Sequence, residues 1–477
     1  MKEEAKVIKF GTDGWRGVIA QDFTFDNVRA CAQGVADYLN DAGTAGQGLV
    51  IGYDTRFASE DFAAAAAEVI AASGIKVYLC PQATPTPVIS YGIVTLKAAG
   101  GVIITASHNP ALWNGLKYKS GGGTSASPEV EVELERCISN AVSKGEVRQL
   151  PLAESVRGGL IEYRDLAPIY FSHLAELVDL DRLRRAELKI VVDSMYGAGA
   201  GYFSTLLRGG GIELVEINGE RNPLFPGIQP EPIARNLTKL CATVKSQGAH
   251  VGLATDGDAD RLGIVDEHGV FLNPLQVFAL LSLYLLEVRG MRGPIIKTLT
   301  TTNMIYRLGE LFNVPVYETP VGFKYIAPLM VAHNAIIGGE ESGGYGFYGH
   351  VPERDGILAG LCFLDLMISL GQTPSQLVDY LYSKVGPHYY QRFDIKFPST
   401  ERQAIISRIA QTPLPYIDDA KVVNLDTTDG FRFVLADGSW LLIRFSGTEP
   451  VVRVYAESNS LARVERMLEA GRKLISI

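Results

Sequence analysis

The sequence predicts an α/β protein of four domains, in which three similar α/β domains with mixed, largely parallel sheets precede a small C-terminal α+β domain. Two observations predict this class. Apolar, strand-like runs alternate with helix-like segments as far as about residue 387, which is typical of βαβ units and parallel sheets. The chain also has 477 residues, too many for one ordinary core, and its last part changes to closely spaced strands.

The first predicted domain covers residues 1–155. Its strands are LVIGYDTR, KVYLC and GGVIITA, separated by an alanine-rich helix from Asp61 and by a helix after TPTP. The segment SASPEVEVELERCISNAVSKG follows. It predicts an amphipathic helix because Val130, Leu134 and Ile138 fall on one stripe.

The same plan returns in residues 156–266 and again in residues 267–380. Strands are predicted at LKIVVDSMYGAG, IELVEIN and HVGLATD in the second domain, and at GPIIKTL, VPVYETP and AIIGGEESGG in the third. This shared pattern suggests internal duplication. Residues 381–477 differ, because alternating strands such as RFDIKF and VVRVYAES lead to one final helix.

Composition and charge exclude several classes of protein. The formal net charge of −9 and the pI near 5.4 argue against general nucleic-acid binding, which needs a basic surface. The five cysteines include no CxxC pair, so neither a disulfide framework nor zinc is indicated, and a cytoplasmic location fits best. MKEEAKVIKF lacks the apolar run of a signal peptide. The most apolar segment, VFALLSLYLLEV, is too short to span a membrane and predicts a buried helix.

One hydroxyl, that of Ser107, stands on a turn at the end of the apolar strand GGVIIT. Its neighbours Thr105, His108 and Lys117 are donors and one possible base, not a Ser/His/Asp triad. Such surroundings suit a phosphate better than an acyl group. A serine is a poor phosphate carrier unless cations spread the charge of the transferring group, so a source of cations is expected nearby.

An acidic loop, DGDADR, lies between two apolar strands and carries Asp256, Asp258 and Asp260. Three hard oxygen ligands in so short a loop suggest Mg²⁺. A solvated acidic turn is the bland alternative. An EF-hand is excluded, because Arg261 stands where that loop needs glycine and the flanking segments are strands.

Two further candidate turns come later in the chain, one basic and one rich in glycine. RFSGTEPVVR offers two guanidinium groups, two hydroxyls and backbone N–H groups, a set that could cradle a phosphate or simply close a β-hairpin. Its candidate residues are Arg444, Ser446, Gly447, Thr448 and Arg453. GGEESGG could be a turn that lets two strands separate, or a loop whose glycines allow a ligand to approach closely.

TASHNP with NGLK, DGDADR, GEESGG and FSGTEP, in this order, resemble the four loops of the α-D-phosphohexomutases, and FGTDGWRG resembles the opening of that family. The resemblance covers essentially the whole chain. It implies four domains around a central cleft and interconversion of a hexose 1-phosphate and 6-phosphate through a hexose 1,6-bisphosphate. It also implies Mg²⁺ as cofactor and glucose 1,6-bisphosphate as activator.

The resemblance further implies roles for single residues. Ser107 would carry the phosphoryl group and, with the three aspartates, hold the metal. Arg16, His108 and Arg261 would lie near the reacting phosphate, and Lys117 would be the general acid or base. Glu340 and Ser342 would bind sugar hydroxyls, and the basic turn would hold the idle phosphate. Lys297, Gly322 and Lys324 are further candidates for substrate binding, and the role of His350 is left open.

The choice of sugar depends on the GEES loop. It resembles that of glucose-preferring members, whereas dual-specificity and glucosamine mutases usually carry histidine where Gly344 stands. We therefore expect glucose phosphate as substrate, with a phosphomannomutase or phosphoglucosamine mutase as the alternative. A metal-dependent sugar phosphatase and a non-catalytic sugar-phosphate-binding protein are remote alternatives. A monomer or homodimer is expected.

Overall fold

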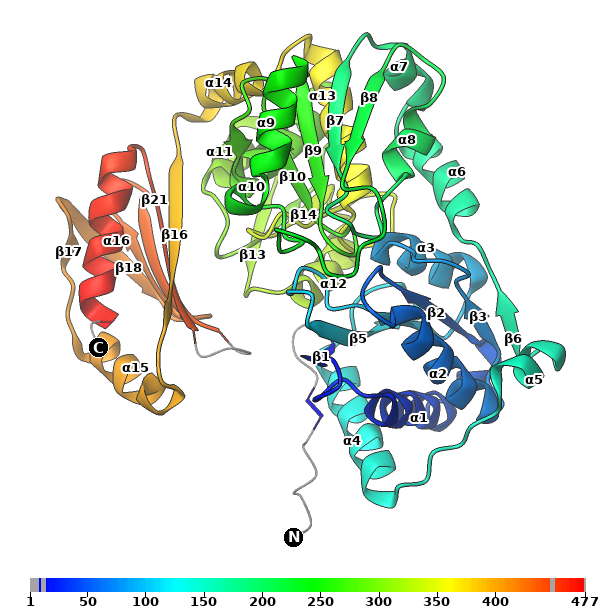
Figure 1. Ribbon diagram of the computed structural model, residues 1–477. Helices are drawn as coiled ribbons and strands as arrows, with labels where there is room; N and C mark the ends of the chain where they lie inside the picture. The colour runs from blue at the N-terminus through cyan, green and yellow to red at the C-terminus, as the bar shows by residue number, and fades with distance from the viewer. Residues whose placement is uncertain (1–7, 10–13, 447–450, 476–477) are drawn as a thin grey trace.

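The computed structural model describes residues 8–9, 14–446 and 451–475. This part of the chain forms four sheets, and Figure 1 shows the C-terminal sheet standing beside the other domains. The first three sheets mix parallel and antiparallel strands, whereas every strand pair in the fourth is antiparallel. The predicted fold class is confirmed.

The first sheet has the order β1-β5-β4-β2-β3-β6. Strand β2 is parallel to β3 and β4, and β3 to β6, while β5 is antiparallel to β4 and β1. The strands are β1 Trp15–Val18, β2 Leu49–Tyr53, β3 Val77–Leu79, β4 Gly100–Ile104, β5 Trp113–Ser120 and β6 Ile161–Tyr163. The helices are α1 Phe25–Asp41, α2 Ser59–Ala72, α3 Thr86–Leu96, α4 Pro128–Lys144 and α5 Leu152–Arg157, with the 3₁₀ turn η1 Ala45–Gln47.

The second sheet has the order β11-β10-β9-β7-β8. Its strands are β7 Lys189–Asp193, β8 Glu213–Ile217, β9 Val251–Thr255, β10 Leu262–Val265 and β11 Phe271–Leu272. Its helices are α6 Ala167–Leu177, α7 Leu180–Arg185, α8 Tyr202–Leu207, η2 Ala234–Asn236 and α9 Thr238–Gln247.

The third sheet has the order β13-β12-β14-β15. Its strands are β12 Ile295–Thr298, β13 Val316–Thr319, β14 Ile337–Gly339 and β15 Tyr345–Phe347. Its helices are α10 Pro274–Leu283, η3 Tyr284–Val288, α11 Met304–Phe312, α12 Phe323–His333, α13 Gly356–Leu370 and α14 Pro374–Val385.

The fourth sheet has the order β16-β21-β20-β19-β18-β17. Its strands are β16 Tyr389–Lys396, β17 Tyr416–Ile417, β18 Ala420–Asp426, β19 Phe431–Leu435, β20 Trp440–Phe445 and β21 Val451–Ser458. Its helices are η4 Ser399–Glu401, α15 Arg402–Gln411 and α16 Leu461–Ile475.

The first three sheets share one topology. In each, the neighbours run β5-β4-β2-β3, β10-β9-β7-β8 or β15-β14-β12-β13, so the strand that comes fourth in sequence pairs with the third at one side. That last strand is antiparallel to its partner in all three sheets. The shared pattern predicted from sequence is therefore a shared topology. The three connecting loops, β4–β5, β9–β10 and β14–β15, carry Ser107, the aspartates and Glu340.

Local sequence signals determine where helices α4 and α10 begin and where α4 ends. Helix α4, expected from its apolar stripe, begins where the Ser127 hydroxyl accepts the N–H of Val130, and ends at Gly145 in the left-handed conformation. Helix α10 begins with a capping box formed by Asn273 and Gln276.

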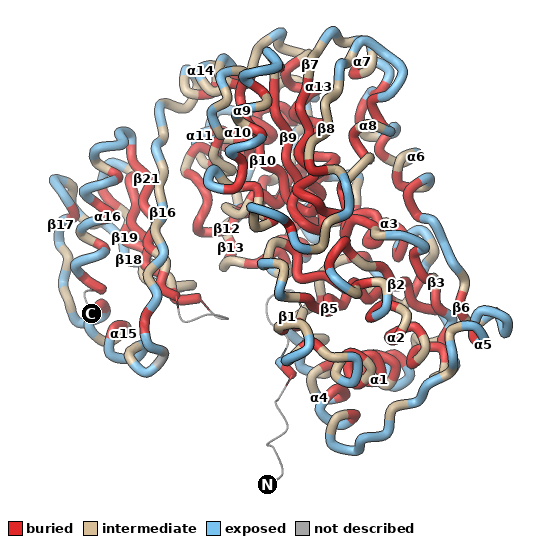
Figure 2. The backbone as a smooth tube through the Cα atoms, in the orientation of Figure 1, coloured by how far each residue is buried: buried red, intermediate tan, exposed pale blue. Residues whose placement is uncertain are grey.

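Buried apolar side chains form several clusters in the described part of the chain. One apolar cluster runs through the first three domains, from Val50 and Ile103 to Leu381, whereas the last domain has its own core between its sheet and α15 and α16. Figure 2 shows the buried segments concentrated in these interiors. The apolar run at 277–286 is buried as predicted. Among the described residues, no single helix is long and apolar enough to cross a membrane.

His350 lies where the first three domains meet. Its Nε2 is 3.0 Å from Oδ2 of Asp355, and its Nδ1 is 3.1 Å from Nε2 of His173 on α6. Tyr91 of α3 stacks on the His173 ring at 4.3 Å, and the hydroxyl of Tyr170 donates to Asp355 at 2.7 Å. These contacts join elements of three domains, which gives His350 a structural role.

His173 makes this junction sensitive to pH. Burial, followed by the nearby His350, lowers the pKa of His173 below its usual 6.5, so the folded chain binds this proton less readily than the unfolded chain. This contribution to stability is complete above the unfolded pKa of about 6.5 and is lost progressively as the pH falls from there through the lower pKa of the folded state. We expect His173→Gln to lose less thermal stability than wild type between about pH 7.5 and about pH 5.5. Melting temperatures measure this, with the exposed His268→Gln as control; parallel curves for wild type and His173→Gln would contradict it.

Candidate active site

Ser107 occupies the turn between β4 and β5. Its backbone adopts a left-handed φ of 51° and its side chain is buried. The N–H donates to the Thr105 hydroxyl at 2.8 Å, and the Ser107 hydroxyl donates to Oδ2 of Asp256 at 3.0 Å and lies 3.3 Å from Nδ1 of His108. A left-handed serine is uncommon and persists where the surroundings fix it. This turn aims the hydroxyl at the aspartate loop.

Arg56 holds the backbone of the serine turn in place, a role that was not predicted from sequence. Its guanidinium is fully buried and donates to the backbone carbonyls of Ser107 and Asn109, both at 2.6 Å, and of Pro110 and Trp113. Asp54 holds the guanidinium at 3.1 Å and also accepts from Thr105 at 2.6 Å. Burial raises the pKa of Asp54 and lowers that of Arg56. The sequence feature that could have indicated this support is the pair of opposite charges, Asp54 and Arg56, directly after β2.

The aspartate loop between β9 and β10 faces the serine. Asp256, Asp258 and Asp260 are all fully buried, and each offers an oxygen within 4.8 Å of the others. Oδ1 of Asp256 accepts the N–H groups of Asp260 at 3.0 Å and of Arg261 at 3.1 Å. The two loops touch: a Cβ at Gly257 would lie 2.4 Å from the carbonyl oxygen of Ser107. Only glycine permits this approach.

Three cations surround the aspartates. Nζ of Lys117, on β5, lies 2.8 Å from Asp258 and 3.5 Å from Asp260. A guanidinium nitrogen of Arg354 lies 2.9 Å from Asp260, and Arg261 Nε lies 3.9 Å from both Asp256 and Asp260. Lys117 and Arg261 are thus placed in the group expected from sequence, whereas Arg354 is an addition.

Burial controls the protonation of this group. It raises the pKa of Asp256 well above the usual range, helped by Asp260 and Asp258. Burial, followed by the charges of Arg261 and Arg16, lowers the pKa of His108 well below 6.5, so this imidazole is neutral at neutral pH. Burial alone would lower the pKa of Arg261, but the charges of Asp256 and Asp260 outweigh burial and raise this pKa above its usual value.

The donor set fits a magnesium ion. Three buried carboxylates repel one another, and the Oδ1 atom of Asp260 accepts no hydrogen bond within the described part of the chain. A hard dication bound by carboxylate oxygens would relieve this repulsion and displace protons from the group. The Ser107 hydroxyl, bonded to Asp256, lies next to this site.

Arg16 and His108 complete the surroundings of the serine. Nη1 of Arg16, on β1, donates to the side chain of Asn109 at 2.6 Å. Nε2 of His108 lies 3.9 Å from Glu231, which is also 3.6 Å from Arg261. Both predicted residues therefore contact the serine turn or its immediate neighbours.

The GEESGG loop forms the turn between β14 and β15. Glu340 is 6% exposed, and burial raises its pKa while Arg354 opposes the rise. Arg354 binds Glu340 at 3.3 Å as well as Asp260, so it connects the aspartate loop with this turn. Ser342 lies in the same turn, partly exposed. Arg354 is the second site residue that was not predicted from sequence, because no feature of VPERDG distinguishes it from the other charged residues of that segment.

Gly344 makes room for Arg354. A Cβ at Gly344 would lie 2.4 Å from Cδ and 2.8 Å from Cγ of that arginine. We expect Gly344→Ala to push the arginine stem away from Asp260 and Glu340 and to lower kcat/KM by about tenfold or more. Gly46→Ala is the matched control, since its Cβ would meet nothing within 4 Å. Steady-state kinetics of both variants would decide, and unchanged kinetics for Gly344→Ala would show that Arg354 does not need this space.

Lys297, Gly322 and Lys324 are placed differently from the group around Ser107. Lys297 is buried on β12 and binds Glu318 at 2.6 Å, which also holds Arg432 of the last domain. Lys324 binds Glu131 of α4 at 2.8 Å, and Gly322 precedes α12. In this conformation Lys324 connects two domains, whereas Lys297 pairs within its own domain with a glutamate that also binds the last domain.

The arginines of the basic turn bind carboxylates of their own domain. Nε of Arg444 lies 3.0 Å from Asp429, and Nε of Arg453 lies 3.5 Å from Asp394. The backbone N–H of Ser446 donates to the Val451 carbonyl at 2.8 Å, which ties the two ends of the turn together. Gly447 and Thr448 lie outside the described residues.

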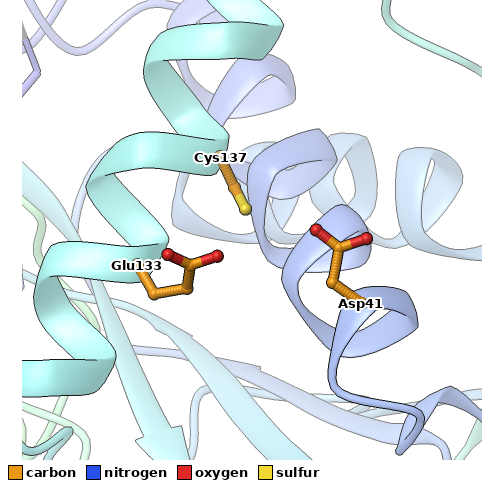
Figure 3. Close-up of side chains that lie close together, drawn as sticks. All are labelled: Asp41, Glu133 and Cys137. Carbon is orange, nitrogen blue, oxygen red and sulfur yellow. The ribbon is translucent and has the colours of Figure 1, made fainter.

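A second group of possible metal ligands lies on the surface between α1 and α4. It consists of Asp41, Glu133 and Cys137, which Figure 3 shows converging from the two helices. Arg136 binds both carboxylates, at 3.2 Å to Asp41 and 2.5 Å to Glu133. Burial also raises the pKa of Cys137, which disfavours the thiolate that a metal needs. This group is a surface ion-pair cluster.

The chain matches, in order, the four domains of the phosphoglucomutase/phosphomannomutase family. The α/β/α domain I matches residues 7–144, domain II residues 168–269 and domain III residues 273–385. The C-terminal domain matches residues 399–474.

Individual relatives cover almost the whole chain. A phosphoglucomutase/phosphomannomutase of Thermococcus kodakarensis is 31% identical over 467 residues, and a Methanobrevibacter smithii protein assigned as a phosphoglucosamine mutase is 31% identical over 471 residues. Each alignment covers 98% of both chains. A solved structure from Thermus thermophilus, assigned as a phosphomannomutase, has a TM-score of 0.87 and 36% identity over 99% of both chains.

Proposed function

Because this chain belongs to the phosphoglucomutase/phosphomannomutase family, we propose that it interconverts the 1-phosphate and 6-phosphate of a hexose through a phosphoryl group on Ser107. The family makes it a mutase-type isomerase, an intramolecular phosphotransferase. The observation that carries the proposal is the Ser107 hydroxyl, held in a left-handed turn 3.0 Å from a buried group of three aspartates.

The proposed reaction moves one phosphoryl group out and one back. The bond from phosphorus to Oγ of Ser107 breaks as a bond to the free sugar hydroxyl forms, and the hydroxyl proton passes to a base, for which we propose Lys117. The resulting hexose 1,6-bisphosphate turns end for end. Its other phosphoryl group then returns to Ser107, and the sugar oxygen regains a proton.

The surrounding residues would stabilise this transfer. Asp256, Asp258 and Asp260, with an oxygen of Ser107, would hold Mg²⁺, which neutralises charge on the transferring phosphoryl group. Arg16, His108 and Arg261 would add donors around the same oxygens. Burial of the group excludes water, which limits loss of the phosphoryl group to hydrolysis.

The sugar would be recognised away from the metal. We propose that Glu340 and Ser342 bind adjacent hydroxyls, with Arg354 holding the Glu340 carboxylate in place. The turn at 444–453 would hold whichever phosphate is idle, and its arginines would then exchange Asp429 and Asp394 for that phosphate. Lys297, Gly322 and Lys324 remain weaker candidates, because Lys297 is engaged in an ion pair within its own domain and Lys324 in one with the first domain.

The glucose preference expected from the GEES loop receives less support than the alternative. The relatives named above are assigned to mannose or glucosamine phosphates as well as to glucose phosphate. We therefore propose mannose or glucosamine phosphate as at least equal candidates. Glucose 1,6-bisphosphate as activator, a cytoplasmic location and a monomer or homodimer stay predictions, as do the domain limits 1–155, 156–266, 267–380 and 381–477.

Turnover of mannose, glucosamine and glucose 1-phosphates, each with Mg²⁺ and a trace of the matching bisphosphate, tests this proposal. We expect isomerisation of at least one sugar without release of inorganic phosphate. Continuous phosphate release without isomerisation would indicate a phosphatase instead. Absence of turnover with all three sugars would contradict the proposed activity.

A further inference from the structure

The last domain contacts the third domain at several places. One lies beyond the end of β12, where Leu299 packs with Trp440, Leu442 and Tyr455, and the N–H of Asn303 donates to Glu457 at 2.8 Å. Others are the ion pair of Glu318 with Arg432 and the GEESGG loop itself. Because the last domain has a core of its own, such contacts determine how it sits on the rest of the molecule.

Glu341 makes the contact at the GEESGG loop. Its neighbour Glu340 faces Arg354 and the aspartate loop, whereas Glu341 faces β16 of the last domain. The hydroxyl of Tyr390 donates to Oε1 of Glu341 at 2.8 Å, and Nη1 of Arg392 lies 3.1 Å from both carboxylate oxygens. Burial, followed by Glu341, raises the pKa of Tyr390 well above 10, so this hydroxyl keeps the proton it donates.

The contact continues along one face of the sheet toward the basic turn. Tyr390, Arg392 and Asp394 alternate along β16 and therefore share a face. Asp394 lies opposite Arg453 of β21, and its two oxygens bind Arg392 at 3.0 Å and Arg453 at 3.5 Å. A row of alternating charges thus joins Glu341 to Arg453.

We propose that Glu341 is a positioning residue that couples the sugar loop to the phosphate-binding turn of the last domain. The inference rests on the proposed mutase function. A phosphate bound by Arg453 would compete with Asp394 for the Arg453 guanidinium. Asp394 would then pair with Arg392 alone, and Arg392 is the residue that binds Glu341. The loop that binds the sugar and the turn that binds the idle phosphate would then respond together. This coupling matters most while the free bisphosphate turns between its two poses.

Glu341→Gln tests the coupling, because the amide can still accept from Tyr390 but no longer carries the charge that holds Arg392. We expect KM for the hexose phosphate to rise by about tenfold with kcat changed far less, and more hexose 1,6-bisphosphate to escape per turnover. Arg392→Gln should have the same two effects, and the double variant should be little worse than either single one.

Glu310→Gln is the matched control, since Glu310 pairs with Arg307 on the exposed side of α11. Hydrogen exchange of the β16 backbone gives a readout without substrate, and it should quicken in Glu341→Gln but not in Glu310→Gln. Unchanged KM, bisphosphate escape and β16 exchange in Glu341→Gln, with normal wild-type turnover, would overturn the positioning role. Failure of wild type with every hexose phosphate would instead overturn the mutase function, and the positioning role with it.

Discussion

Replacement of Ser107 by alanine is expected to lower mutase turnover by about 10⁴-fold or more, because the chain loses the oxygen that carries the phosphoryl group between the two ends of the sugar. Folding should change little. The backbone N–H of residue 107 keeps its bond to Thr105, the Arg56 guanidinium still holds the carbonyl, and alanine tolerates the left-handed turn about as well as serine does.

Two measurements and a control variant distinguish this role from a structural one. Intact-protein mass spectrometry after incubation with hexose 1,6-bisphosphate should show a phosphoryl adduct on wild type and none on Ser107→Ala. Melting temperatures should agree closely. Ser90→Ala, a fully buried serine on α3 of the same domain, should retain both adduct and turnover. Substantial mutase activity in Ser107→Ala would exclude a phosphoserine at this position.

Much of the fold could be predicted because it depends on short-range patterns. The strands before Ser107, Asp256 and Glu340 are apolar runs that end in, or are followed by, glycine or a polar residue, and each proved to be the third strand of a repeated topology. Helix α4 could be placed from its apolar stripe and its flanking serine and glycine. Such signals lie within a few residues of the element that they predict.

The supports of the site could not be predicted in the same way, since they depend on contacts between distant segments. Arg56 lies 51 residues from Ser107 in sequence, yet it holds the carbonyl of that serine. Arg354 and Gly344 fit together only because the GEESGG loop and the segment before α13 meet in space. A single arginine in a sequence usually lies on the solvated surface, so neither Arg56 nor Arg354 could be distinguished as a site residue. Lys297 and Lys324 could be selected from the sequence as candidates, yet in this conformation both are engaged in ion pairs, with Glu318 and Glu131.

The second large effect is expected at the aspartate loop, where Asp258→Asn removes one of three buried carboxylates at almost constant volume. Asp258 accepts from the Thr86 hydroxyl at 2.6 Å and pairs with Lys117 at 2.8 Å. The amide can keep the first contact, whereas the ion pair is lost and the proposed site is left with two carboxylates. We expect turnover at saturating sugar to fall by about 10²-fold or more, because stabilisation of the transferring phosphoryl group by a metal is worth several kcal/mol.

Calorimetric titration with Mg²⁺ alone separates the two roles of Asp258. If the carboxylate holds the metal, the affinity for Mg²⁺ falls together with turnover, and added Mg²⁺ restores part of the activity. If it serves only to orient Lys117, turnover falls while the affinity for Mg²⁺ stays at the wild-type value, which would remove Asp258 from the metal site. Asp181→Asn, an exposed carboxylate on α7, should leave both quantities unchanged. Because the oxygens of the three aspartates lie within 4.8 Å of one another, a loss of affinity at Asp258 should also appear on neutralising Asp256 or Asp260.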